Sequence, residues 1–297
     1  MPSFAAYAGY RAAMKTTPPR RGRNTIRLTR RGRIVVTAAC AMAVAAVIAV
    51  TVTLALPDED PAGPARQTTL TIPEGWRASQ VYQAVDKALA LPAGSTQKAV
   101  PKARLKLPSQ AGGNPEGYLY PGTYPVARHT TPEALLSRMV QVADTQFGGS
   151  VAAGAQSNAM NVYQAVTLAS LVQAESTTPD DMGKVARVIH NRLARGMPLQ
   201  LDSTINYALN RAMVHTSEKD TKLNSPYNSY SRMGLPPTPI GNPGDRAVQA
   251  AINPTPGDWL YFVTVKPGDT RFSASYEEQM GNVAESRQQR PAARAAG

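Results

Sequence analysis

The chain has 297 residues, of which 42% are hydrophobic, so it is long enough to bury one or two cores and is not wholly disordered. Its formal charge is +12, but nine of the Arg and Lys residues lie within residues 1–33, which contain no acidic residue. The remainder carries only +3, which removes the main argument for a nucleic-acid partner. The single cysteine, Cys40, excludes an intrachain disulfide and any multi-cysteine zinc site.

Residues 34–56 form a run of 23 residues without a charge, Pro, Asn or Gln. Such a run is long enough to cross a hydrocarbon core of about 30 Å as one helix. Arginines precede it and three acidic residues follow it, so the positive-inside rule predicts a single-pass anchor with a cytoplasmic N-terminus and the rest of the chain outside. A cleaved signal peptide is the competing interpretation, and Arg30-Arg31 also resembles part of a twin-arginine export signal.

After a Pro-rich acidic spacer, the first folded elements alternate in type. Residues 69–72 alternate polar and apolar as a strand does, and residues 78–90 repeat apolar side chains at helical spacing. The Pro/Gly-rich stretch 107–125 contains alternating tyrosines, which predict a strand pair beside a groove. A helix is predicted from Thr131 to about Phe147.

The second half of the chain is predicted to be mostly helical. The small, polar segment 151–158 indicates a loop, and residues 159–176 indicate a helix. Thr178-Pro179-Asp180-Asp181 is a good helix start, and that helix ends at Gly196. Residues 197–207 alternate and lead into a short helix at Ile205. The seven prolines between positions 226 and 256 indicate an ordered loop wall or a linker.

The usual nucleotide and hydrolase motifs are absent from the sequence. It contains no phosphate-binding GxxxxGK loop, no strand-linked GxGxxG and no GxSxG elbow. The three histidines, His129, His190 and His215, have no ligand-like spacing. We therefore expect neither a metal nor another cofactor.

Glu175 is the acidic residue that the helical pattern singles out, because it falls on the apolar stripe of residues 168–172 at the end of its helix. Partial burial and the negative end of the helix dipole would both raise its pKa toward the range of a general acid. The alternative is a glutamate at the edge of the core, satisfied by a backbone donor. Asp202 is the other candidate carboxylate, since its alternating polar segment either lines a groove or meets solvent.

Several motifs around these residues occur in the order found in one family. Residues 168–176 are similar to a Leu-Ala-Ser-Ile-Val-Glu-x-Glu-Thr helix, and residues 185–193 to Val-Ala-x-Val-x-x-Asn-Arg-Leu. Residues 196–204 match Gly-Met-x-Leu-Gln-x-Asp-x-Thr, and residues 227–240 match Tyr-Asn-x-Tyr followed by Gly-Leu-Pro-Pro-x-Pro-Ile. The chain thereby resembles the YceG/MltG family of membrane-anchored endolytic murein transglycosylases, with coverage of about residues 68–287.

The resemblance implies that Glu175 is the catalytic glutamate. It would protonate the oxygen that leaves N-acetylmuramic acid and then deprotonate the C6 hydroxyl, which closes a 1,6-anhydro ring without water. Gln173 stands where many relatives carry a first Glu, and histidines common near the relatives' C-terminus are missing at residues 269–279. The predicted substrate-binding residues, which would line a glycan groove, are Asn191, Gln200, Asp202, Ser203, Thr204, Tyr207, Tyr227 and Asn228.

The expected fold class is α+β, with a small LysM-like module and a mixed α+β YceG-like catalytic domain behind a single transmembrane helix. The predicted parts are a basic cytoplasmic tail at 1–33, the anchor at 34–56, a spacer at 57–67, the LysM-like module with connecting strands at 68–130, the catalytic domain at 131–287 and a disordered tail at 288–297.

The resemblance implies that the substrate is the glycan strand of peptidoglycan, with cell-wall synthases or division proteins as candidate protein partners. We expect no nucleic-acid partner. Two other functions stay open on the sequence: a hydrolytic muramidase in which Asp202 guides water, and a glycan-binding scaffold with Glu175 idle.

Overall fold

The computed structural model describes residues 68–176, 178–212 and 216–295. The predicted cytoplasmic tail, membrane anchor and spacer lie outside these residues. Among the helices of the described ranges, none is both long and apolar enough to cross a membrane.

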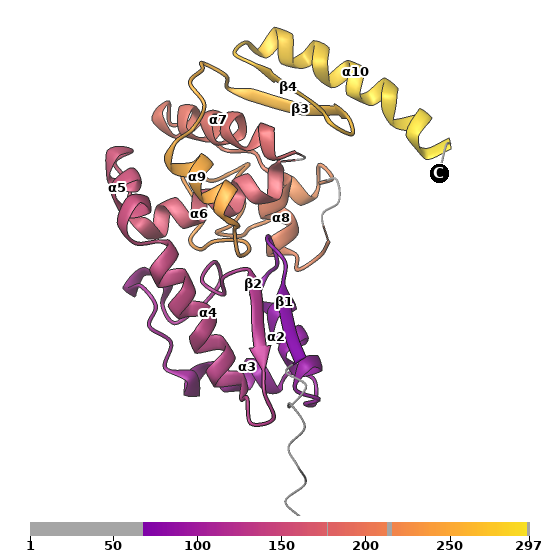
Figure 1. The fold of residues 1–297 in the computed structure, drawn as a ribbon. Coiled ribbons are helices and arrows are strands. Elements are labelled where there is room, and N and C mark those ends of the chain that lie inside the picture. The colour runs from indigo at the N-terminus through magenta and orange to yellow at the C-terminus, as the bar shows by residue number, and fades with distance from the viewer. Residues whose placement is uncertain (1–67, 177, 213–215, 296–297) are drawn as a thin grey trace, which may run out of the picture. The chain divides into compact units, whose positions relative to one another are not determined.

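The N-terminal elements form a strand–helix–helix–strand unit. Strand β1 (Thr68–Ile72) pairs antiparallel with β2 (Gly122–Val126), and α2 (Ala78–Ala88) and α3 (Ser95–Ala99) lie between them in sequence. Leu70 and Ile72 of β1 are buried while their neighbours are exposed, as the predicted alternation requires. The predicted strand at 69–72 and helix at 78–90 are therefore confirmed. Figure 1 shows this unit beside α4 (Pro132–Gln146), the helix predicted from Thr131.

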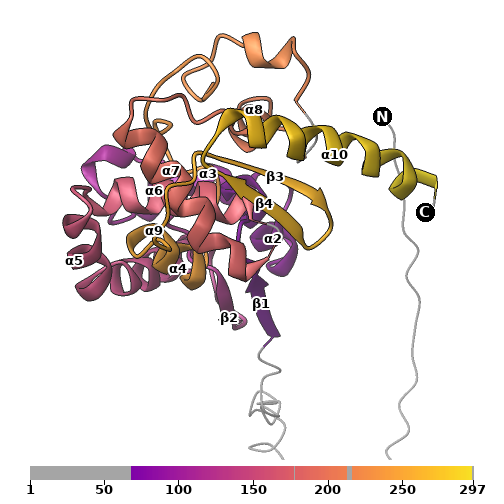
Figure 2. The same cartoon turned by 90° about the horizontal axis from the view of Figure 1, so that it is seen from above.

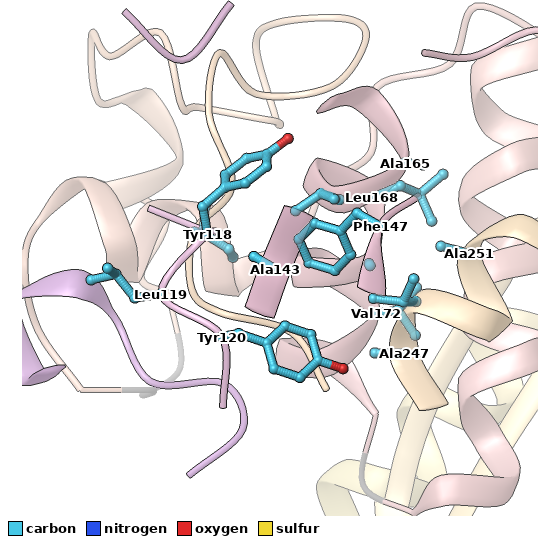
Figure 3. Close-up of a cluster of buried hydrophobic side chains, with 14 of the residues drawn as sticks. Tyr118, Leu119, Tyr120, Ala143, Phe147, Ala165, Leu168, Val172, Ala247 and Ala251 are labelled. Atoms are coloured by element: carbon cyan, nitrogen blue, oxygen red, sulfur yellow. The ribbon is translucent and has the colours of Figure 1, made fainter. Parts of the chain in front are cut away.

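The strand pair predicted from the tyrosines of the stretch 107–125 is confirmed only at Tyr124, which lies on β2 opposite Leu70 of β1. The tyrosines of residues 116–121 do not form a strand beside a groove. This segment is a turn, and Tyr118 and Tyr120 are buried in the core against Phe147 at the end of α4, with ring centroids 5.6 and 5.8 Å from its ring. Figure 3 shows both tyrosines among aliphatic side chains of α6 and α9. Tyr118 and Tyr120 alternate in the sequence because both rings pack into the core from a turn, and large aromatic rings are well suited to fill a core.

A helical layer continues the same core. It contains α5 (Gly149–Ser157), α6 (Val162–Glu175), α7 (Met182–Ala194), α8 (Asp202–Ala208) and α9 (Asp245–Ile252). Thr178 caps the turn that leads into α7, as its sequence predicts, with its hydroxyl accepting the Asp181 N–H at 3.3 Å. One hydrophobic cluster extends from Leu70 to Ile252, so the N-terminal unit and the helical layer share one core.

Two of these helices were missed by the sequence prediction. Helix α5 lies where a loop was predicted, because its small side chains allow close packing: a Cβ on Gly154 would approach Ile252 of α9 to 2.8 Å. Helix α9 lies inside the proline-rich stretch 226–256. Residues 245–252 themselves contain no proline, and Ala247, Val248 and Ala251 place one face in the core.

The C-terminal part is a β-hairpin covered by a long helix. Strands β3 (Tyr261–Lys266) and β4 (Asp269–Ser273) pair antiparallel, and α10 (Tyr276–Ala295) lies along them, as Figures 1 and 2 show. The prediction of a disordered tail from residue 288 is wrong as far as residue 295, because α10 continues to Ala295. Its acidic first turn, with Glu277 and Glu278, suits a helix N-terminus.

Candidate active site

Glu175 is the last residue of α6, the helix that passes through the middle of the core. Asn161 and Gln164 form a capping box at its start, and residues 165–172 are buried on every side of the helix. Ser176 then adopts an extended conformation, which ends the helix. The sequence thus fixes Glu175 at the point where a buried helix reaches the edge of the core.

The Glu175 carboxyl is half-buried and bound by one backbone donor. The Ser203 N–H in the first turn of α8 donates to Glu175 Oε1 at 3.2 Å. Burial raises the pKa of Glu175, the neighbouring Asp202 charge raises it further, and the interaction with Ser203 offsets part of this rise. The direction expected from the sequence is confirmed, and the carboxyl retains its proton at higher pH than an ordinary glutamic acid.

Asp202, the second carboxylate of the site, is held by a tyrosine. The Tyr230 hydroxyl donates to Asp202 Oδ1 at 2.5 Å, and the Thr216 N–H lies 3.4 Å from Oδ2. Burial and the hydrogen bond to Asp202 both raise the pKa of Tyr230, so the phenol keeps its proton and remains a donor. Tyr230 was not among the predicted site residues, although it lies in the Tyr-Asn-x-Tyr motif.

Glu175 and Asp202 face a cavity of about 880 Å³. One wall comes from the loop 199–202 at the entry to α8, and the other comes from the β3–β4 hairpin and α10. Exposed Gln200 lies on the first wall with φ +52°, fixed by its N–H bond to Ser229 O at 2.9 Å. The sequence did not predict that the hairpin and α10 form a wall of this cavity, because they lie far from Glu175 along the chain.

Three predicted glycan ligands make their hydrogen bonds inside the framework of the fold. Asn228 is fully buried, and its side-chain amide donates to two backbone carbonyls at 2.7 and 2.9 Å. Thr204 is equally buried and bonds the Leu201 carbonyl and the Ser229 hydroxyl, both at 2.8 Å. The Asn191 amide donates to Trp259 O at 2.8 Å. Direct glycan contact by these three residues stays a prediction.

Tyr207 and Tyr227 lie together in a second cluster. Their ring centroids are 5.0 Å apart, the Tyr227 hydroxyl bonds Thr238 at 2.9 Å, and the Arg77 guanidinium stacks over Tyr207 at 5.2 Å. The Tyr207 hydroxyl donates to Glu116 Oε2 at 3.0 Å. Tyr207 therefore links α8 to the N-terminal unit, and neither tyrosine lines the cavity that Glu175 faces.

Glu116 is a buried carboxyl that the sequence did not single out. Its side chain accepts the Ala78 N–H at 2.9 Å and the Tyr207 hydroxyl, and only 4% of the residue is exposed. Burial raises its pKa to about 7, although both hydrogen bonds and the charge of Arg77 oppose the rise. The Glu-Gly-Tyr-Leu-Tyr-Pro segment could have revealed it, since a glutamate flanked by core residues is itself buried.

Helix α7 holds the hairpin side of the cavity through one polar face. Arg192 is buried, and its guanidinium donates to the carbonyls of Leu260 at 2.6 Å and Leu199 at 2.7 Å. Arg187 donates to Thr255 O at 2.8 Å, and Lys184 lies over the Phe272 ring. Arg192 thereby ties together the two walls of the cavity, a role that sequence alone did not indicate.

Within the described ranges, no three His, Cys, Asp or Glu side chains gather as a metal ion would require. A partly buried carboxyl with a raised pKa, at the wall of a large cleft and beside a second, engaged carboxylate, is the arrangement of a general acid–base site.

The chain belongs to the YceG-like family, whose sequence model matches residues 47–285. A solved structure of a putative YceG-like protein from Listeria monocytogenes is similar, with a TM-score of 0.64 and 31% identity over 72% of this chain and 75% of that one. The mixed α+β YceG-like domain is therefore established.

Two curated relatives are both named endolytic murein transglycosylase. The Bacillus subtilis protein is 35% identical over 164 residues, which is 55% of this chain and 45% of that protein. The Streptococcus pneumoniae protein of strain D39 is 32% identical over 244 residues, which is 73% of this chain and 44% of that protein. The matched region thus spans less than half the length of either relative.

Proposed function

We propose that this protein is an endolytic peptidoglycan transglycosylase, which cleaves the bond between N-acetylmuramic acid and N-acetylglucosamine within glycan strands. The observation that carries the proposal is Glu175: a half-buried carboxyl with a raised pKa, facing a cavity of about 880 Å³. The names of the two curated relatives support the same activity.

In this mechanism Glu175 acts twice. Its protonated form donates a proton to the glycosidic oxygen as the bond to C1 of N-acetylmuramic acid breaks. The resulting carboxylate then accepts the proton of the same sugar's C6 hydroxyl while that oxygen bonds to C1, which returns the glutamic acid and forms the 1,6-anhydro ring. One carboxyl suffices because the nucleophile is part of the substrate, whereas ordinary glycoside hydrolysis uses two.

The contacts of Asp202 favour this reaction over hydrolysis. Its carboxylate lies in the same cavity, as a water-activating base would, but its Oδ1 is already bound at 2.5 Å by the Tyr230 hydroxyl. That engagement favours a role in orienting the cleft and the sugar. A muramidase, in which Asp202 guides water, is the alternative reaction, and a glycan-binding scaffold is the alternative without catalysis.

Mass spectrometry of fragments released from purified peptidoglycan separates these functions. The full chain is compared with Glu175→Gln, which keeps the shape and removes the proton, and with Glu133→Gln in the first turn of α4 as a matched control. We expect anhydro-ended glycans from the parent and Glu133→Gln, and a loss of at least about a thousandfold in Glu175→Gln. Reducing ends would indicate hydrolysis, and strand binding without cleavage would indicate a scaffold. Full activity in Glu175→Gln would refute the assignment.

We propose that residues 34–56 anchor the protein in the cell membrane by one helix, with residues 1–33 in the cytoplasm and the catalytic domain outside, where peptidoglycan lies. The strand–helix–helix–strand order within residues 68–126 supports a LysM-like module at 68–130. Cell-wall synthases or division proteins are the proposed protein partners.

A further inference from the structure

A second cavity, of about 660 Å³, lies next to the Glu175–Ser203 pair. Its lining includes Ala174 and Ser203, the direct sequence neighbours of the two residues, Glu175 and Asp202, that face the first cavity. One side of it comes from the β1–α2 connection and the start of α2, and the other comes from residues 210–212 after α8. The two cavities are therefore lined by adjacent residues of the chain, next to the candidate catalytic carboxyl.

The groups in this second cavity are those that bind neutral sugars. Trp76 is half-buried and offers an aromatic face, and Gln80, Gln83 and Asn210 offer exposed side-chain amides. Aromatic faces pack against the C–H faces of pyranose rings, while amides donate to and accept from hydroxyl and N-acetyl groups. An apolar platform with a few convergent polar groups is the usual composition of a ligand site.

The cationic side chains of this cavity are engaged within the protein. Arg77 donates to Arg211 O at 3.0 Å and stacks over Tyr207, and Arg211 pairs with Asp220 at 2.9 Å. Arg77 also lies near the Glu116 carboxyl, and the lining includes the Glu74 carboxyl, so the cavity favours a neutral polar ligand over an anion. Ser203, which also lines this cavity, is only 1% exposed, and its side chain interacts with the Glu175 carboxyl.

We propose that this second cavity is a distal glycan subsite, in which Trp76 stacks against a sugar ring on the opposite side of the scissile bond from the first cavity. The inference rests on the proposed function, because a strand cut in its interior must extend past the catalytic carboxyl in both directions. The site would bind uncharged sugar rings through Trp76 and the amides of α2. It makes Trp76 a determinant of substrate length and gives it no part in the chemical step.

The two tryptophans of the chain allow a direct test. Trp259 packs against Phe272 and lines neither cavity, so Trp259→Phe leaves Trp76 as the sole reporter. The full chain carrying Glu175→Gln and Trp259→Phe is titrated with muramyl oligosaccharides of increasing length, and tryptophan fluorescence is compared with calorimetric binding. We expect a saturable fluorescence change only with oligosaccharides long enough to reach beyond the first cavity. Calorimetric binding of long oligosaccharides without any fluorescence change would overturn the subsite.

Kinetics supply the second measurement and separate this inference from the proposed function. In the active chain, Trp76→Ala should raise KM for long strands about tenfold and leave kcat and the cleavage of short oligosaccharides unchanged. Trp76→Phe should give an intermediate KM, and Trp259→Phe should match the parent. If the parent cleaves strands and Trp76→Ala cleaves long strands with parental KM, the subsite is wrong and the proposed function stands. If the folded parent neither cleaves nor binds strands, both fall.

Discussion

Replacing Glu116 by Gln should change how the stability of the protein depends on pH. Glu116 is 4% exposed, and burial raises its pKa from the ordinary 4.5 to about 7. Between these two pH values the folded protein holds a proton that the unfolded chain releases, so rising pH favours unfolding. The stability associated with the protonated carboxyl is complete below pH 4.5 and is lost as the pH rises through about 7.

The size of the effect follows from the same two values. At about 1.4 kcal/mol per pH unit, the free energy of unfolding should fall by about 3 kcal/mol between pH 4.5 and pH 8 through Glu116 alone. Gln cannot ionise, yet its amide oxygen can still accept the Ala78 N–H that the carboxylate accepts at 2.9 Å. Glu116→Gln should therefore match the parent near pH 5 and exceed its stability by up to about 3 kcal/mol at pH 8.

Urea denaturation of the parent and Glu116→Gln at half-unit steps from pH 5 to pH 8 measures the difference directly. Glu278→Gln, which removes the same charge from an exposed position on α10, is the matched control and should run parallel to the parent. Subtracting the parent curve cancels the other titrating groups, including Glu175. Parallel curves for Glu116→Gln and the parent would refute the assignment of a raised pKa to this carboxyl.

Three further substitutions test the framework of the site, with the urea midpoint as the measurement. Gly117→Ala should lower the free energy of unfolding by about 2–4 kcal/mol, because φ is +86° and the new Cβ would lie 2.5 Å from the Pro239 side chain. A loss below about 1 kcal/mol would contradict this. Arg192→Lys should cost about 2–3 kcal/mol, because one ammonium cannot replace the bonds to the carbonyls of both walls, and unchanged stability would refute that role. Tyr230→Phe should cost about 1–2 kcal/mol and lower kcat, and unchanged values would show that its bond to Asp202 is dispensable.

Local patterns predicted the elements whose stabilising contacts lie near one another in sequence. The strand β1 follows from alternation, and the start of α7 follows from a capping threonine followed by proline and acids. Helices α5 and α9 depend instead on each other: Gly154 and Ile252 meet across 98 positions of sequence. A segment of small residues such as 149–157 has no strong periodicity, so only its packing partner reveals it as a helix.

The residues of the candidate site also divide into those that local sequence patterns predict and those that they do not. Glu175 could be predicted because its helix is apolar up to that residue, which implies both burial and a raised pKa. Asn228 and Thr204 could not be distinguished from glycan ligands, because a polar side chain in a motif is equally suited to satisfying buried backbone carbonyls. The tyrosines at 118 and 120 show the reverse error, since their alternation suggested a groove and their rings fill the core.

The chemistry proposed for Glu175 depends on elements that are remote in sequence. Its raised pKa arises mainly from burial, and the wall that faces it is built from residues of the β3–β4 hairpin and α10, between 87 and 114 positions later in the chain. Arg192 bonds the carbonyl of Leu260 at the base of that hairpin and the carbonyl of Leu199 in the opposite wall. A change that releases the hairpin would hydrate Glu175 and lower its pKa toward that of an ordinary glutamic acid, which would leave less of the protonated form at neutral pH. The pKa of Glu175 therefore depends on the hydrogen bonds by which Arg192 of α7 holds the hairpin, as well as on the helix α6 that carries Glu175.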